Sequence, residues 1–258
     1  MIQTAQSAFL ALLLAHLLGD FLLQPAWIAQ NKGKRFWPLF WHGIAHYLLA
    51  WVCLFLFAPA PFSSIYSQFV VLIYAAIHLL IDKLKSSSIS RHRSFDNWQV
   101  FLIDQLLHII VLAFAACALV RSCPVTLFYG LKPSPAAKFH ILETAIVYVA
   151  VVIGGGYLIR YLTQGFAVKS VSRGPRSLHN AGLYVGWIER FLVITAISVR
   201  SPALVGLILT GKSIARFPEF KETRFAEYFL IGTLLSFSLA LMGGILLQYL
   251  IYGAVSFN

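Results

Sequence analysis

The segment from Leu10 to Gln24 reads LALLLAHLLGDFLLQ, an apolar run that nonetheless contains a histidine and an aspartate. A second run, YSQFVVLIYAAIHLLIDK at residues 66–83, contains the same two polar residues in the same order. In both runs the histidine precedes the aspartate by four positions, so the two side chains stand on one face of a helix. Apolar runs of this length are typical of transmembrane helices. The polar pair inside each run indicates a site shared between such helices.

The rest of the chain continues the apolar pattern. Of its 258 residues 59% are hydrophobic and 11% are charged, whereas a soluble domain carries about 25% charged residues. We expect helices at 7–24, 38–58, 66–83, 98–120, 140–162, 183–200, 202–217 and 227–252. The seventh is short enough to be re-entrant or interfacial. The sequence therefore predicts an all-α, polytopic transmembrane bundle of seven or eight helices.

Basic residues mark one set of loops. They follow the first, third, fifth and seventh expected helices, as Lys32, Lys83, Lys169 and Lys221 illustrate, whereas residues 59–68 carry no charge. The positive-inside rule then places the N-terminus outside and the basic loops in the cytoplasm. No basic residue precedes the first apolar run, so we do not expect a removable signal peptide. The net charge of +11 indicates contact with membrane lipids rather than with nucleic acid.

Polar residues four positions apart occur in each of the first four expected helices. The pairs are His16/Asp20, His42/His46, His78/Asp82 and Asp104/His108. Each member of the last two pairs lies 62 positions after a member of the first two. We therefore expect residues 7–58 and 66–120 to be two copies of one helical hairpin, a parallel repeat related by an axis along the membrane normal. Residues 1–120 are expected to form one domain and residues 121–258 a second set of helices packed on it.

The eight polar side chains predict a metal site. In the expected topology all eight fall at a similar depth in the cytoplasmic half of the bilayer. An ionised aspartate near the bilayer centre costs about 2.5–3.5 kcal/mol, and imidazole partners or a bound cation would offset that cost. Imidazole and carboxylate together suit a divalent transition metal such as Zn²⁺ or Mn²⁺, and eight donors are enough for one or two ions. The alternative is a metal-free hydrogen-bonded network or a proton relay.

The C-terminal half has charged residues of its own. Glu189 and Arg190 lie inside an apolar run, and Lys212 and Arg216 lie near the cytoplasmic end of the next. One interpretation is a structural lattice of ion pairs. The other is that Arg190, Lys212 and Arg216 bind an anionic or lipid-like small molecule and present it to the His/Asp cluster. Glycines at 154–156, and at 182 and 186 in GxxxG spacing, predict close helix contacts.

Several of these motifs resemble a bacterial integral-membrane family known only as domain of unknown function 3307. They are His16-Leu-Leu-Gly-Asp20-Phe-Leu-Leu-Gln24, the His42/His46 pair, His78-Leu-Leu-Ile-Asp82 and Asp104-Gln-Leu-Leu-His108. The C-terminal strings at residues 186–190, 212–217 and 227–236 are similar to that family as well. The resemblance implies a multi-pass protein of the bacterial inner membrane, and it implies no reaction.

Three functions fit these patterns. The first is a metal-dependent hydrolase of a lipid-like or phosphate-bearing substrate, in which Asp20 or Asp82 serves as the base. No GxSxG motif is present, which disfavours covalent catalysis by a serine. The second is a transporter for a divalent metal or for protons, since polar groups between paired repeats are common in carriers. The third is a metal-sensing membrane partner of a cytoplasmic protein.

Overall fold

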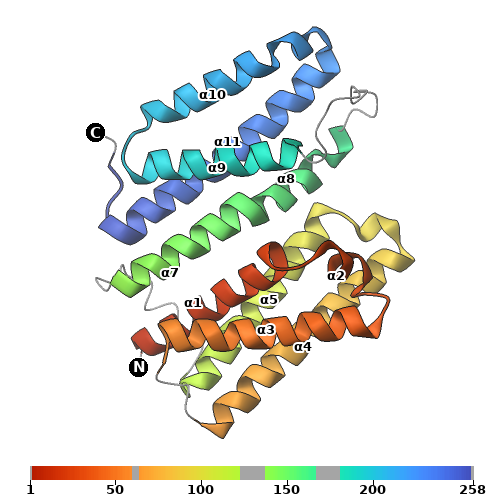
Figure 1. Ribbon diagram of the computed structural model, residues 1–258, viewed down its shortest axis with the longest axis vertical. Coiled ribbons are helices and arrows are strands. Elements are labelled where there is room, and N and C mark those ends of the chain that lie inside the picture. The colour runs from red at the N-terminus through yellow and green to blue at the C-terminus, as the bar shows by residue number, and fades with distance from the viewer. Residues whose placement is uncertain (1, 60–63, 123–136, 167–180, 257–258) are drawn as a thin grey trace. The chain divides into compact units, whose positions relative to one another are not determined.

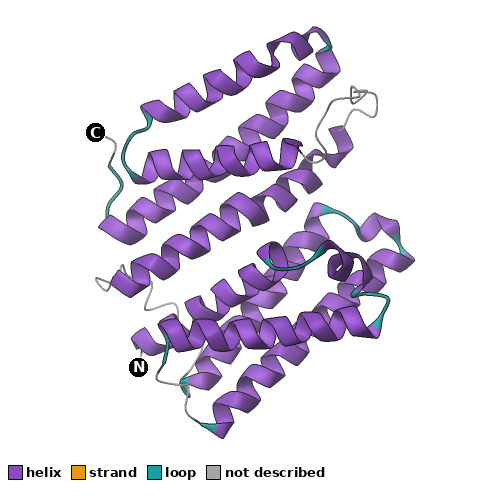
Figure 2. Ribbon diagram, in the orientation of Figure 1, coloured by secondary structure: helices purple, strands orange, loops and turns teal. Residues whose placement is uncertain are grey.

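The computed structural model of the protein describes residues 2–59, 64–122, 137–166 and 181–256 (Figure 1). These residues form helices joined by turns and loops, with no strand among them (Figure 2). The chain divides into two compact units, here named unit 1 (Met1–Ile146) and unit 2 (Val147–Asn258). The sequence placed the division after residue 120. In the structure, Leu142 is buried in the core of unit 1, so the segment around it belongs to that unit.

Unit 1 is built on four long helices. They are α1 (Ile2–Leu17), α3 (Phe36–Phe57), α4 (Ile65–Arg91) and α5 (Trp98–Leu119). Helix α1 packs against α3 and α5, and α4 packs against the same two helices. A π-helical turn, η1 (Leu18–Leu22), extends α1, and the short helix α2 (Ala26–Asn31) packs against α3. The turn η2 (Arg93–Phe95) leads into α5, and α7 (Ala137–Tyr148) follows later in the chain.

The helix contacts of unit 1 have the pattern that a repeat requires. Helix α1 packs on α3 as α4 packs on α5, and α3 packs on α4 as α5 packs on α1. Exchanging the two hairpins therefore leaves the set of contacts unchanged. The repeat itself, and its axis along the membrane normal, stay a prediction.

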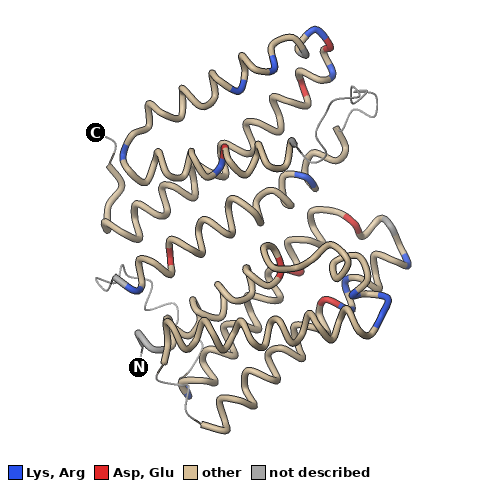
Figure 3. Tube along the Cα trace, in the orientation of Figure 1, with Lys and Arg blue, Asp and Glu red and all other residues tan. Residues whose placement is uncertain are grey.

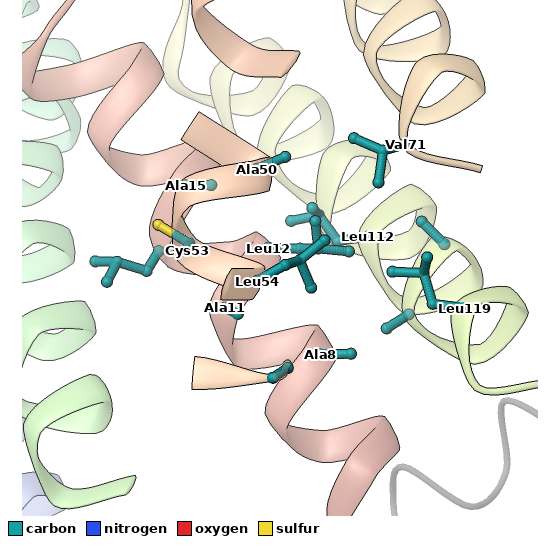
Figure 4. Close-up of a cluster of buried hydrophobic side chains, with 14 of the residues drawn as sticks. Ala8, Ala11, Leu12, Ala15, Ala50, Cys53, Leu54, Val71, Leu112 and Leu119 are labelled. Atoms are coloured by element: carbon teal, nitrogen blue, oxygen red, sulfur yellow. The ribbon is translucent and has the colours of Figure 1, made fainter. Parts of the chain in front are cut away.

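Helix α1 is the central helix of unit 1. Its segment Ala5–Leu22 is 61% buried, whereas the apolar segments of α3, α4 and α5 are each 33% buried. The α1 side chains in the core are mostly small, which lets the neighbouring backbones approach closely. Figure 4 shows this core, whose labelled residues are Ala8, Ala11, Leu12, Ala15, Ala50, Cys53, Leu54, Val71, Leu112 and Leu119.

Unit 2 surrounds one long helix, α11 (Thr223–Tyr252). The chain enters it through a π-helical turn, η3 (Val149–Gly154), which continues into α8 (Gly155–Thr163) and η4 (Gln164–Phe166). Helices α9 (Ala181–Ser198) and α10 (Ala203–Arg216) and the turn η5 (Phe217–Lys221) complete it. Helix α11 packs against α8 and α9, and α10 packs against α9. A Cβ atom added at Gly244 would lie 2.6 Å from Cβ of Ile197, so α9 and α11 are in close contact there.

Six helical segments of the described residues are long and apolar enough to cross a membrane. They are Ala5–Leu22, Phe36–Phe57, Ile65–Arg91, Trp98–Leu119, Lys138–Phe166 and Thr223–Tyr252. Helices α9 and α10 are not among them. The 14 residues of α10 span about 21 Å at 1.5 Å per residue, which is less than the hydrocarbon thickness of about 30 Å. The expected seven or eight spans thus become six candidates.

The ends of the expected helices lie within a few residues of the observed ones, with two exceptions. The helix expected at 66–83 continues to Arg91 as α4. Hydropathy falls after Asp82, but no glycine or proline interrupts the helix there. Helix α2, which was not expected, occupies the segment after Pro25. Figure 3 shows that most charged residues of α1–α5 gather at the end of the bundle where α2 lies. The basic residues at 169, 173 and 176 lie outside the described part of the chain.

Candidate metal centre

Five buried histidines meet between the helices of unit 1. His16, His42, His46, His78 and His108 are each at most 1% exposed. Their rings touch in a continuous group, with centroid separations of 3.8 Å for His46 and His78, 4.5 Å for His78 and His108, and 4.8 Å for His16 and His108. The histidines that the sequence placed on four separate helices therefore come together in one cluster.

Four side chains of this cluster bring donor atoms within 4.8 Å of one another, and we name them the primary set: Asp20, His42, His46 and His78. The Oδ1 atom of Asp20 lies 3.2 Å from Nε2 of His42, 3.1 Å from Nε2 of His46 and 3.6 Å from Nε2 of His78. The Nε2 atoms of His42 and His78 are 3.3 Å apart. In a tetrahedral site with metal–ligand bonds of 2.0–2.1 Å, neighbouring donor atoms are about 3.3 Å apart. The primary set therefore fits a zinc-like ion in both chemistry and spacing.

The Nε2 atom of His42 is crowded by polar atoms. Besides Asp20 and His78, it has Oδ2 of Asp82 at 2.9 Å and Nζ of Lys32 at 3.2 Å. A ring nitrogen offers either one hydrogen or one lone pair. It cannot satisfy two carboxylates, a second imidazole and an ammonium group at the same time. If the primary set held a cation, the lone pair of His42 Nε2 would bind that cation. The nitrogen would then not have to form hydrogen bonds with all of these groups.

Several other ring nitrogens have no hydrogen-bond partner among the described residues. They are Nδ1 and Nε2 of His16, Nδ1 of His46, Nδ1 of His78 and Nε2 of His108. Buried polar atoms nearly always have a partner, so these nitrogens point to ions or water molecules within the cluster. A second set of donor atoms, from His78, Asp82 and His108, also lies within 4.8 Å of one another. The two sets share His78.

Lys32 and Gln24 reach into the cluster from the segment that contains α2. The Nζ atom of Lys32 lies 2.5 Å from Oδ2 of Asp82, and the side-chain amide of Gln24 lies 3.1 Å from Nδ1 of His42. Burial alone would lower the pKa of Lys32, but the nearby carboxylates of Asp82 and Asp20 raise it above its ordinary value. The sequence had assigned Lys32 only to membrane topology. The sequence feature closest to predicting a contact from this segment was Gln24, the last residue of the motif that begins at His16.

Asp104 stands apart from the other seven residues. Its Oδ2 atom lies 2.7 Å from Nζ of Lys85 and accepts a hydrogen bond from Gln105 at 3.1 Å. Its other carboxylate oxygen is 3.8 Å from Nδ1 of His108, and that nitrogen donates to the backbone carbonyl of Asp104 at 2.8 Å. Asp104 belongs to neither set of donor atoms. The structure thus places it at the edge of the cluster, in an ion pair with a lysine.

The π-helical turn η1 and a glycine set the position of Asp20. Asp20 lies within η1. In a π-helical turn the backbone hydrogen bonds join residues five positions apart instead of four, so the side chains are rotated relative to those of an α-helix. A Cβ atom added at the neighbouring Gly19 would lie 2.5 Å from Nε2 of His46. Only a residue without a side chain lets α1 approach α3 closely enough for Asp20 to meet His46.

Arg190, Lys212 and Arg216, which the sequence suggested as ligands for an anionic substrate, all line one cavity of unit 2. The glycines of the expected GxxxG pair have different environments. An added Cβ at Gly182 would meet nothing within 4 Å, and one at Gly186 would meet the guanidinium of Arg190 rather than another helix. The expected close helix contact is therefore wrong for these two glycines.

Residues 8–129 match the family model described as "Protein of unknown function (DUF3307)". The match contains all eight histidines and aspartates of the four expected pairs, and the three C-terminal strings lie beyond it. Neither the curated proteins nor the solved structures include a significant match to the chain. Over residues 8–129, somewhat less than half of its length, this chain is similar to the DUF3307 family.

Proposed function

We propose that unit 1 binds a divalent transition metal ion inside a multi-pass protein of the bacterial inner membrane. The observation that carries this proposal is the primary set, in which one carboxylate oxygen and three imidazole nitrogens lie within 4.8 Å of one another, with the Asp20 oxygen 3.1–3.6 Å from all three nitrogens. In this proposal the N-terminus lies outside the cell and the cluster lies towards the cytoplasm. This orientation is supported by the charged residues that gather at the end of unit 1 near α2 (Figure 3).

The charges around the cluster favour one ion rather than two. Of the three aspartates, Asp82 has Lys32 at 2.5 Å and Asp104 has Lys85 at 2.7 Å. Each ammonium group already neutralises one carboxylate, and among the described residues Asp20 has no lysine in direct hydrogen-bond or ion-pair contact. With neutral imidazoles, a single divalent cation in the primary set gives the cluster a net charge of about +1, whereas two such ions would raise it to about +3. A second ion would have to displace Lys32 from Asp82.

The reaction that we propose is hydrolysis of a lipid-like or phosphate-bearing ester. A bound Zn²⁺ or Mn²⁺ would lower the pKa of a coordinated water molecule towards neutrality. Because Asp20 belongs to the primary set, Asp82 is the better candidate for the base that accepts the proton of that water. The water oxygen would then form a bond to the phosphorus or acyl carbon of the substrate, the ester bond would break, and the leaving alcohol would take up the proton that Asp82 had accepted. Lys32 holds the carboxylate of Asp82 in place.

A second candidate function, transport of a divalent metal or of protons, is favoured by two observations. The regular helix α1 gives way to the π-helical turn η1 beside the cluster, and carriers commonly place their sites where a helix is interrupted. The two donor sets also share His78, so one ion could occupy either set in turn.

Metal analysis of protein purified in detergent tests the proposal. We expect about one zinc or manganese ion per chain in the wild type, as a four-donor site requires. His46→Ala and Asp20→Asn should each remove most of the metal. His92→Ala is the matched control, because His92 is exposed and follows α4 outside the cluster. Wild-type protein that contains no metal after incubation with Zn²⁺ or Mn²⁺ would refute the proposal.

Two assays on the metal-loaded protein separate the candidate functions. A hydrolase should cleave bis(p-nitrophenyl) phosphate or a short-chain phospholipid, and Asp82→Asn should abolish turnover while metal remains bound. A carrier should instead move radioactive zinc, or protons, into proteoliposomes without cleaving either probe. Each assay thus gives a positive result for one function only.

A further inference from the structure

A cavity of about 430 Å³ lies within unit 2, and its walls carry more positive than negative charge. It is lined by residues of α8, α9, α10 and α11. Among the described residues of its wall, tyrosine aside, the ionisable ones are Glu189, Arg190, Lys212 and Arg216. Three of these are cations and one is an anion, so the lining has a net charge of about +2 at neutral pH. The volume falls in the range of about 300–1,000 Å³ that small-molecule sites occupy.

Arg190 is buried in the wall of this cavity and has neutral partners. Its side chain is 5% exposed. Nε and Nη2 donate to the backbone carbonyl of Val152 at 3.0 and 2.7 Å, and Nη1 donates to Oγ of Ser236 at 3.1 Å. These bonds use three of the five N–H groups of a guanidinium. The partners fix the orientation of the guanidinium but do not neutralise its charge.

The backbone around Arg190 is shaped to hold the guanidinium. Val152 lies in the π-helical turn η3, where the regular pattern of backbone bonds is altered and a carbonyl can accept from a side chain. A Cβ atom added at Gly156 would lie 2.9 Å from Nη2 of Arg190, and one at Gly186 would lie 3.2 Å from Nη1. Gly156, Gly186 and the π-helical turn η3 thus all make room for Arg190. An arginine buried by chance would not require three such features around it.

The carboxylate of Glu189 is directed to a different cation. Its Oε2 atom lies 2.5 Å from Nζ of Lys212. Lys212 also lies 5.3 Å from the ring centroid of Phe229, which orients the ammonium group towards the aromatic wall. Glu189 and Lys212 therefore neutralise each other, and the charge of Arg190 is balanced by no carboxylate in direct hydrogen bond or ion pair among the described contacts. A buried arginine without a direct ion-pair partner is costly in an apolar surrounding.

Much of the remaining lining of the cavity is apolar. Phe225, Tyr228 and Phe229 of α11 contribute aromatic surface, and Val185 and Ile159 contribute aliphatic surface. A ligand that matches both parts has an anionic group and an apolar body. A phosphate monoester carries about −1.5 to −2 charges at pH 7, which is close to the net charge of the lining, and arginine pairs well with phosphate oxygens.

We propose that this cavity of unit 2 binds a phosphate monoester, with the phosphate oxygens on Arg190 and on the cations of α10. None of the residues of this site belongs to the candidate metal centre, and the proposal does not depend on the function proposed for unit 1. The phosphate monoester can come from a lipid head group, as in phosphatidic acid, or from free phosphate and its soluble esters. The aromatic walls favour the lipid as the natural source.

Native mass spectrometry of the purified protein tests the proposal with three probes: dioctanoyl phosphatidic acid, dioctanoyl phosphatidylcholine and inorganic phosphate. We expect the phosphatidic acid to bind about tenfold or more tightly than the phosphatidylcholine, whose head group is a zwitterionic diester. Tighter binding of phosphatidic acid than of inorganic phosphate would identify the lipid as the source. Equal binding of the two would identify the free anion. Equal binding of both lipids, or no binding of any probe, would overturn the proposal.

Charge variants of the cavity complete the test. Lys212→Gln and Arg216→Gln should each weaken binding of phosphatidic acid by about tenfold, because each removes a charge-assisted contact. Glu189→Gln should tighten it, since it raises the positive charge of the lining. Lys221→Gln is the matched control, because it removes an exposed cation of unit 2 that does not line the cavity. Metal content and melting temperature verify that each variant is folded. If these variants have a lower melting temperature but unchanged phosphatidic acid binding, the charged residues of the cavity form only a structural lattice of ion pairs. That result would overturn the proposal.

Discussion

The ammonium nitrogen of Lys32 lies 2.5 Å from Oδ2 of Asp82, although the two residues come from different parts of the chain. Lys32 caps the short helix α2, whereas Asp82 lies in α4. The same ammonium is 3.2 Å from Nε2 of His42, a member of the primary set. Lys32 therefore places a cation that belongs to the protein beside both Asp82 and His42.

Removing that cation should change metal binding in a specific way. Lys32→Ala leaves the buried Asp82 without its partner, so stability without metal should fall by about 3 kcal/mol, as for other broken buried ion pairs. Added zinc should restore most of that loss, and the number of ions per chain should rise above that of the wild type. Melting curves with chelator and with zinc measure both effects. Lys34→Ala, at an exposed lysine of the same loop, is the control. An unchanged melting temperature for Lys32→Ala in chelator would contradict this role.

The Lys32 ion pair should be insensitive to pH near neutrality. The pKa of Lys32 is raised above its ordinary value, so its stabilising contribution is fully present below that value and is lost only as the pH rises through the raised pKa. The difference in melting temperature between wild type and Lys32→Ala should thus stay constant from about pH 6 to pH 9. A difference that shrinks steadily across this range would show that Lys32 is not held as an ammonium group.

Gly19 should not tolerate even a methyl group. In Gly19→Ala the new Cβ would lie 2.5 Å from Nε2 of His46, so the ring must move out of the primary set. We expect loss of most bound metal and a loss of stability of about 1–3 kcal/mol, as for other overpacked sites. Gly43→Ala is a useful comparison, because its Cβ would meet the end of the flexible Leu79 side chain and no metal donor. Equal metal contents in the two variants would argue against the primary set.

Two aspartates of the cluster should respond differently to the same conservative change. Asp104 pairs with Lys85 and belongs to neither donor set, so Asp104→Asn should retain metal and lose only stability. Asp20→Asn should lose metal because it removes the carboxylate of the primary set. Metal content measured side by side decides the matter. Loss of metal from Asp104→Asn at unchanged stability would mean that Asp104 is a ligand after all.

Arg190 should depend on the shape of its side chain as well as on its charge. Arg190→Lys keeps the charge but loses the paired donation from Nε and Nη2 to the Val152 carbonyl. We expect a loss of stability of about 1–3 kcal/mol, since a buried carbonyl then lacks its partner. Thermal unfolding in detergent measures this loss. A melting temperature equal to that of the wild type would show that the π-turn does not need the guanidinium.

The sequence by itself determined the helices and the content of the cluster. Long apolar runs without internal breaks form helices whatever surrounds them, and a spacing of four positions fixes His16 and Asp20 on nearly one side of the same helix. For this reason the all-helical fold could be predicted. The five histidines on four helices could likewise be expected to meet, because polar groups in apolar helices turn towards one another.

Only the tertiary structure decided which donors act together. Asp20 and Asp104 look alike in the sequence, yet one meets three imidazoles and the other meets Lys85. Lys32 and Lys85 follow apolar runs as ordinary loop charges, and only the return of the chain through α2 and the continuation of α4 bring them to the aspartates. The π-helical turn at Leu18–Leu22 also cannot be predicted from a sequence pattern of fixed helical period. The spacing of residues along a helix fixes the directions of their side chains around that helix. Distances between helices depend instead on packing at single residues such as Gly19, which local sequence patterns do not encode.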